Sequence, residues 1–158
     1  MEHADDVLLV GPGDGRVVTR VNGEQTVIKA GRARTAGAYA LRENVVPAGF
    51  RRVPMHLHRA AEEAFYVLDG ILSVRAGDRR LDAAPGAFVV IRRGTVHALA
   101  NLGERPVRWL TVISPASQAE WVEAEDDLLA AGGEPDPEAL AEIHHRYGLE
   151  IVGPPPEW

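Results

Sequence analysis

The stretch PMHLHRAAEEAFYVLDG, residues 54–70, contains side chains of the types that bind metal ions. His56 and His58 are separated by one residue, so in a β-strand both imidazoles project from the same face. Glu63 begins the next apolar run and can reach back across the intervening turn, and His97 follows a glycine turn at the head of another predicted strand. Three imidazoles and one carboxylate suit a divalent ion such as Fe, Mn, Ni, Co, Cu or Zn. The lack of thiolate ligands argues against a closed structural zinc site.

Each of these residues also has an ordinary structural interpretation. A single pair of histidines at i and i+2 is weak support for a metal site. Glu62 and Glu63 together can form a solvated strand start, and His97 alone can be a half-buried histidine. The joint occurrence of the four residues is therefore what favours a metal site.

The composition limits the class of protein. The chain has 158 residues, of which 46% are hydrophobic and 25% charged, as expected for one globular domain. Its net charge of -6 argues against nucleic-acid binding, and its lack of cysteine excludes disulfides and thiol catalysis. The N-terminal MEHADDVLLVGPGDG is acidic, and its apolar run is too short for a signal peptide or a membrane anchor. We therefore expect a cytoplasmic protein that acts on a small molecule, without nucleic-acid or membrane partners.

Short β segments separated by turn signals extend from Arg16 to about Ile113. They read RVVTRV, AYALRENVV, AFYVLDG, ILSVRAGD, AFVVI, HALAN and VRWLTVI. Strands this short and this closely spaced predict a closed or sandwiched antiparallel β fold. No long helical pattern interrupts them, which disfavours a parallel sheet built from βαβ units.

The pattern becomes helical after the last of these segments. Ser117, with Glu120 three residues later, forms a capping-box signature for a helix that would stop near Gly132. Asp136 can cap a second helix that has Pro137 at its first position and runs towards Gly148. We therefore predict two C-terminal helices.

Two segments of the sequence resemble the two motifs of the cupin superfamily. The first motif, G(x)5HxH(x)3–4E(x)6G, is matched over residues 49–70, with six residues instead of five between the first glycine and His56. The second motif, G(x)5PxG(x)2H(x)3N, is matched over residues 86–101, with Arg92 in the place of the proline. This arginine adds a cation near the turn that could favour an anionic substrate, but we interpret it as a solvent-facing side chain.

The resemblance assigns the metal ligands. Only Glu63, and not Glu62, is followed by six residues before Gly70, so the motif selects Glu63. The four ligands that the resemblance implies are His56, His58, Glu63 and His97.

The resemblance also implies the fold. The tail PDPEALAEIHHRYGLEIVGPPP is similar to the C-terminal extension of small one-domain bacterial cupins of the quercetin-dioxygenase-like group. The expected fold is all-β, a cupin double-stranded β-helix (a jelly-roll barrel) with two C-terminal α-helices. Residues 1–115 would form the barrel domain and residues 116–158 a helical extension packed on it, because about 40 residues rarely bury a core alone.

A barrel of this kind offers an apolar pocket beside the metal. The side chains predicted to line the pocket, unless they serve only as barrel core, are Phe65, Val67, Phe88, Val90, Leu99 and Trp109. In the cupins that resemble quercetinase, the glutamate matched by Glu63 both ligates the metal and accepts a proton from the substrate. The resemblance therefore favours a metal-dependent dioxygenase of secondary metabolism that acts on a hydroxylated aromatic or enolic molecule. The alternatives are a non-oxidative enzyme similar to the aromatic polyketide cyclases and a non-catalytic small-molecule-binding protein.

Two expectations concern the outer surface. Small cupins resemble one another in forming dimers, so we expect a homodimer, with the segment from Arg16 to Val21 as the candidate strand at its interface. His144 and His145 are adjacent on the second predicted helix and cannot share one face. We therefore interpret them as surface or dimer-contact residues and not as further metal ligands.

Overall fold

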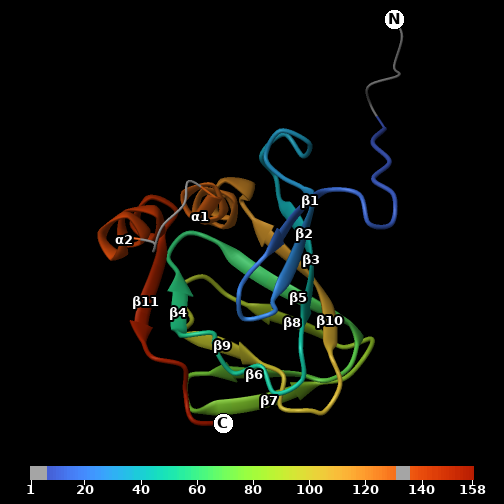
Figure 1. Cartoon of the computed structure of the whole chain (residues 1–158), viewed down its shortest axis with the longest axis vertical. Helices are drawn as coiled ribbons and strands as arrows, with labels where there is room; N and C mark the ends of the chain where they lie inside the picture. Colours follow the sequence, from blue (N-terminus) through green and yellow to red (C-terminus); the bar gives the residue numbers. More distant parts are fainter. Residues whose placement is uncertain (1–6, 131–135) are drawn as a thin grey trace, which may run out of the picture.

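The computed structural model describes residues 7–130 and 136–158, which form two facing antiparallel sheets and a pair of helices (Figure 1). The larger sheet contains, in spatial order, β1 (Arg16–Thr19), β2 (Gln25–Ala30), β3 (Ala40–Val46), β10 (Val107–Ser114), β5 (Glu62–Asp69) and β8 (Phe88–Ile91). The smaller sheet contains β11 (Leu149–Gly153), β4 (Met55–His58), β9 (His97–Ala100), β6 (Leu72–Ala76) and β7 (Arg79–Ala83). The prediction of an antiparallel β fold with two C-terminal helices is confirmed.

The core lies between the two sheets because alternate side chains of each strand point inward. On β3 and β10 the burial alternates along the whole strand. The principal core cluster draws large apolar side chains from both sheets, among them Val46, Phe65, Val67, Leu72, Val74, Val107 and Trp109. Both sheets are therefore needed to bury this core, and they hold the inward-facing polar residues between them.

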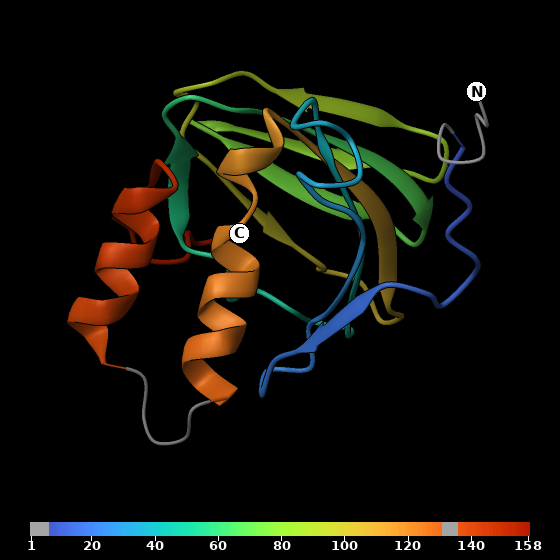
Figure 2. The same ribbon diagram turned by 90° about the horizontal axis from the view of Figure 1, so that it is seen from above.

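The helices bridge the edges of the two sheets. α1 (Trp121–Ala130) contacts β1, α2 (Pro137–Arg146) contacts β11, and the two helices pack against each other. Figure 2 shows them side by side at one end of the barrel. The gap between the β1 edge and the β11 edge is thus covered by the C-terminal part of the chain.

The predicted helix starts differ in accuracy. Asp136 accepts a hydrogen bond from the backbone N–H of Glu138, with Pro137 at the first helical position, so the cap of α2 is confirmed. The predicted start of the first helix is wrong. Ser117 lies inside a 3₁₀ turn, η1 (Ala116–Gln118), and α1 begins only at Trp121. The predicted stop at Gly132 lies outside the described residues.

The C-terminal strand β11 was not expected from the sequence. It pairs antiparallel with β4, the strand that carries two of the candidate metal ligands, and Ile151 lies opposite His56. Its first residue, Leu149, is buried. The C-terminal segment therefore contributes a strand to the barrel as well as the two helices.

Strand β1 forms one edge of the larger sheet. Its position fits the strand expected at a dimer interface, and the homodimer stays a prediction. Among residues 7–130 and 136–158, no helix is long and apolar enough to cross a membrane.

Gly70, the last residue of the first motif, lies at a close approach of two backbone segments, and a substitution there would measure how tightly they pack. Its φ is +76°, and a Cβ atom there would lie 2.8 Å from the carbonyl oxygen of Pro106. Gly86 has a φ of +86° with nothing within 4 Å of the corresponding Cβ position, so it is a matched control. We expect Gly86→Ala to lower the free energy of unfolding by about 1 kcal/mol, from backbone strain alone, and Gly70→Ala by about 3 kcal/mol. Urea unfolding of both metal-free variants measures the difference, and equal losses would contradict the close approach.

Candidate metal centre and cavity

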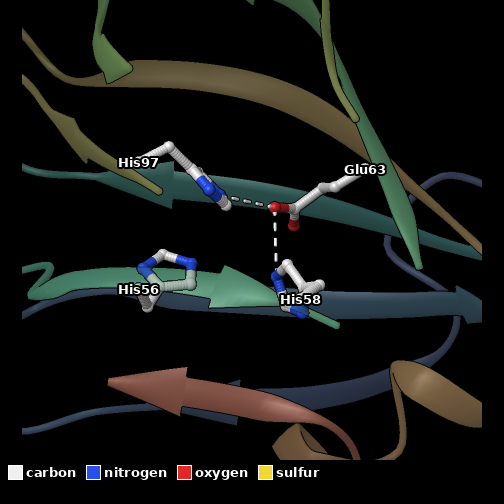
Figure 3. Close-up of side chains that lie close together, drawn as sticks. All are labelled: His56, His58, Glu63 and His97. Carbon is white, nitrogen blue, oxygen red and sulfur yellow. Dashed lines mark hydrogen bonds and ion pairs between the residues drawn. The ribbon is translucent and has the colours of Figure 1, made fainter. Parts of the chain in front are cut away.

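The four candidate ligands come together from both sheets (Figure 3). His56 and His58 are the two buried side chains of β4, as the i and i+2 spacing predicts. His97, on the neighbouring β9, lies directly opposite His56 in the sheet. Glu63 reaches them from β5 in the facing sheet, while its neighbour Glu62 is exposed.

The cluster is compact and almost closed to solvent. One ligand atom from each of the four residues lies within 4.8 Å of all the others, and the residues are between 0 and 9% exposed. An oxygen of Glu63, Oε2, is 3.1 Å from Nε2 of His97 and 3.4 Å from Nε2 of His58. This grouping is compatible with a single metal ion.

The outer nitrogens of two rings fix their orientation. Nδ1 of His56 lies 2.9 Å from the carbonyl oxygen of Pro54, and Nδ1 of His97 lies 3.0 Å from that of Thr95. A carbonyl oxygen only accepts, so each Nδ1 carries the hydrogen and each Nε2 of the neutral ring keeps a lone pair. Such backbone contacts are typical of histidines that ligate metals.

The inner atoms of the cluster need a cation. Because Nδ1 of His97 carries the hydrogen, its neutral ring would direct the lone pair of Nε2 at the carboxylate of Glu63, which would place two acceptors 3.1 Å apart. Both ring nitrogens of buried His58 have no hydrogen-bond partner. Buried polar atoms are normally satisfied. A divalent ion coordinated by the Glu63 carboxylate and by Nε2 of His97 and of His58 would satisfy these three groups, so the donor set fits a metal.

The charges agree with this interpretation. Burial, reinforced by His97, lowers the pKa of His56 to about 4, so this ring is neutral at neutral pH. Burial alone would raise the pKa of Glu63, but the rings of His58 and His97 beside its carboxylate hold this pKa well below the ordinary value. Neutral imidazoles and an ionised carboxylate are the forms that bind metal ions.

A cavity of about 250 Å³ lies beside the cluster, and both His56 and Glu63 form part of its wall. Three of the predicted wall residues, Phe65, Leu99 and Trp109, line this cavity. A protein-bound ion at the cluster would therefore border a space of the size of a small molecule.

The other three predicted wall residues lie elsewhere. Val67 is fully buried in the core and is not one of the residues that line the cavity. Phe88 and Val90 are 62% and 49% exposed on the outer face of β8, so their prediction as pocket walls is wrong. The inward positions of this strand belong to Val89 and Ile91, because Ile91 pairs with Glu63. A shift of one residue reverses the face of every side chain in a strand.

The far wall of the cavity is formed by residues that the sequence did not single out. Glu125 of α1 lies 2.5 Å from both Nη2 of Arg20 and Nε2 of His144, and all three line the cavity. The interpretation of His144 as a surface residue is therefore wrong, while His145 is exposed. The spacing of four residues between Leu140 and His144, on one helix face, is the sequence signal that could have placed His144 inward.

Comparisons with known proteins agree with the fold. Residues 43–113 match the family model described as Cupin domain, a segment that contains all four residues of the cluster. This part of the chain is therefore similar to a cupin domain. A search of curated proteins found no match to the sequence.

Solved structures show the same cupin architecture. KdgF from Halomonas sp. superposes with a TM-score of 0.54 at 20% identity, covering 63% of this chain and 87% of that one. A predicted oxalate decarboxylase from Thermotoga maritima gives 0.55 at 19% identity, covering 63% and 90%. An uncharacterized conserved protein with a double-stranded β-helix domain from Klebsiella pneumoniae gives 0.51 at 17% identity, covering 68% and 84%. These similarities confirm the predicted double-stranded β-helix, and at such identities they show the fold alone.

Proposed function

We propose that this protein is a metal-dependent oxygenase that acts on a hydroxylated aromatic or enolic small molecule, as the quercetin-dioxygenase-like cupins do. The observation that carries the proposal is the double position of Glu63. Its carboxylate belongs to the metal-ligand cluster and also forms part of the cavity wall. A substrate in the cavity would thus meet the ligand cluster and a carboxylate base at the same place.

His56, His58, Glu63 and His97 would hold the ion. Three imidazoles and one carboxylate are donors that Fe, Mn, Ni, Co, Cu and Zn all accept. When bound, the ion supplies Lewis acidity or redox chemistry at positions that the protein leaves open.

The chain's own residues have three roles in this proposal. Glu63 is ionised and forms part of the cavity wall, where it accepts the proton of the substrate hydroxyl. Phe65, Leu99 and Trp109 provide an apolar wall that excludes water and packs against a flat ring. Hydrogen bonds from Nδ1 of His56 and of His97 to backbone carbonyls keep two of the ligands oriented without rearrangement.

The test compares two neighbouring carboxylates. Glu63→Gln removes the base, whereas Glu62→Gln removes the same charge from an exposed neighbour. With quercetin and acetylacetone as probes and an oxygen electrode as the readout, we expect Glu63→Gln to reduce turnover roughly 10²- to 10⁴-fold. Glu62→Gln should match the wild type. Metal content is measured on each variant, and unchanged turnover by metal-loaded Glu63→Gln would exclude the proposed base.

Oxygen dependence separates the alternative functions. Turnover of the same probes under strict anaerobiosis would refute the oxygenase and support a non-oxidative enzyme, such as a ring-closing cyclase. Saturable binding of the probes without any product would replace it with a binding protein.

A further inference from the structure

A buried arginine stands in the wall of the cavity beside the metal ligands. Strand β3 buries alternate side chains, and one of them is Arg42, which is only 4% exposed. Arg42 and Glu63 line the same cavity. Burying a guanidinium group is costly unless an opposite charge or several hydrogen bonds compensate it.

The neighbours of Arg42 do not supply that opposite charge. Its Nη2 atom donates a hydrogen bond of 2.7 Å to the carbonyl oxygen of Ala119, and its guanidinium carbon lies 5.4 Å from the centre of the Trp121 ring. Both of these groups are uncharged. Arg20, in the same cavity, is in contrast paired with Glu125 at 2.5 Å. In the part of the chain that the structure describes, no carboxylate oxygen lies within 4.0 Å of the Arg42 guanidinium.

The surrounding charges compensate Arg42 only from a distance. Burial lowers the pKa of Arg42, and the nearby carboxylates of Glu63, Glu123 and Glu24 partly oppose this effect. An arginine stays protonated in proteins, so the cavity contains a buried positive charge next to the ligand cluster.

Three neutral side chains of the wall, those of Trp109, Thr111 and Asn44, are already hydrogen-bonded. Nε1 of Trp109 donates to Oγ1 of Thr111 at 2.9 Å, and this hydroxyl donates to Oδ1 of Asn44 at 2.8 Å. The amide nitrogen of Asn44 donates in turn to Oγ1 of Thr26 at 2.9 Å. A guanidinium group has five N–H donors, of which the described residues accept one from Arg42, through Ala119. In the described part of the wall, Nε1 of Trp121 is a single buried donor without a partner, whereas Arg42 is a buried cation with several donors to spare.

We propose that the cavity binds a small molecule that carries a carboxylate group, and that Arg42 holds this carboxylate. The planar fork of a guanidinium matches a carboxylate with two parallel hydrogen bonds. One buried cation also matches one negative charge, whereas a phosphate dianion would face repulsion from Glu63, Glu24 and Glu125 in the same wall. Arg52 borders the cavity too, but its side chain is exposed and water screens its charge. The carboxylate site rests on the proposed function in one respect: it specifies the class of substrate that binds in the same cavity.

The experiment compares an acid with its neutral amide, which has nearly the same shape. Benzoate and benzamide, and salicylate and salicylamide, are titrated into the zinc-loaded and the metal-free protein and followed by NMR. The variants are Arg42→Gln and Arg108→Gln. The second is a control with the same change of charge, because Arg108 lies on β10 and its side chain is 52% exposed. We expect the wild type to prefer each acid over its amide by about tenfold or more in both metal states. In Arg42→Gln, the affinities for each acid and its amide should differ by no more than about twofold. Arg108→Gln should retain the preference of the wild type.

The comparison of acid with amide can be made on the wild type alone. The test therefore does not depend on whether the Arg42 variants fold. No preference for the acids in the wild type, or no binding of either acid up to about 10 mM, would overturn the inference even if no variant folds. Equal acid preference in Arg42→Gln and the wild type would overturn it as well. Arg42→Lys, which keeps the charge but loses the fork, should retain part of the preference.

The two proposals fail separately in this design. A protein that binds no metal and turns nothing over, yet shows an Arg42-dependent preference for the acids in the metal-free state, would refute the oxygenase and support the carboxylate site. Normal turnover of neutral probes, without any preference for the acids in binding, would support the oxygenase and refute the carboxylate site.

Discussion

Replacement of His97 by alanine is expected to weaken divalent metal binding by more than about 100-fold, since even the loss of a residue that only supports a ligand costs 10- to 100-fold. His97 is fully buried, Thr95 fixes its ring, and its Nε2 atom faces the carboxylate of Glu63 at 3.1 Å. Removing it takes away one of the four candidate donors. Elemental analysis after dialysis against a metal buffer measures the loss.

The matched control is His145→Ala, which removes an exposed histidine from α2. This variant should bind metal as the wild type does. Thermal unfolding provides a second readout, because an ion that binds only the folded state stabilises it by roughly 4 kcal/mol at a free concentration a thousandfold above its Kd. Wild type and His145→Ala should both gain this stability on metal addition, and His97→Ala should not. A full equivalent of tightly bound metal in His97→Ala would show that the ion binds elsewhere.

The part of the site that could be predicted follows from local rules. Alternation along a strand places His56 and His58 on one face wherever the strand lies in the fold, and the structure buries both. The same rule, once the motif selects Glu63, requires Glu62 to point the other way, and it is exposed. Strand spacing and turn residues were enough for the antiparallel fold, because each turn is specified by its own few residues.

What could not be predicted depends on the packing of distant segments. The run AFVVI is apolar at every position, so its pattern does not tell which face of β8 points inward, and Phe88 and Val90 were assigned to the wrong face. Strand β7, RRLDA, has four exposed residues and is recognisable only from its pairing with β6. The spacing of Leu140 and His144 indicates a shared helix face, but His144 reaches the cavity because α2 packs against both α1 and β11, which the local sequence does not specify.

Strand β11 was not predicted from the sequence either, and it pairs with the strand that carries two of the candidate ligands. β4 carries His56 and His58 but pairs with β9 at a single position, His56 with His97. On its other side β4 pairs with β11 from His58 to Met55. The position of two candidate metal ligands therefore depends on a strand that follows the two helices.

Truncation of the chain after Gly148, which removes β11, should therefore weaken metal binding by about 10- to 100-fold, as the loss of a group that orients ligands does. It should also lower the free energy of unfolding of the metal-free protein by about 2 to 4 kcal/mol, because buried Leu149 and the β4 pairing are lost together. The control ends after Pro154, so it keeps β11 and the hydrogen bond of 3.3 Å from the backbone N–H of Met55 to the Pro154 carbonyl. Metal titration and urea unfolding of both truncated proteins separate the two effects. If the shorter protein binds metal as tightly as the control, β4 holds its histidines in place without β11, and the tail serves only the helices and the far wall of the cavity.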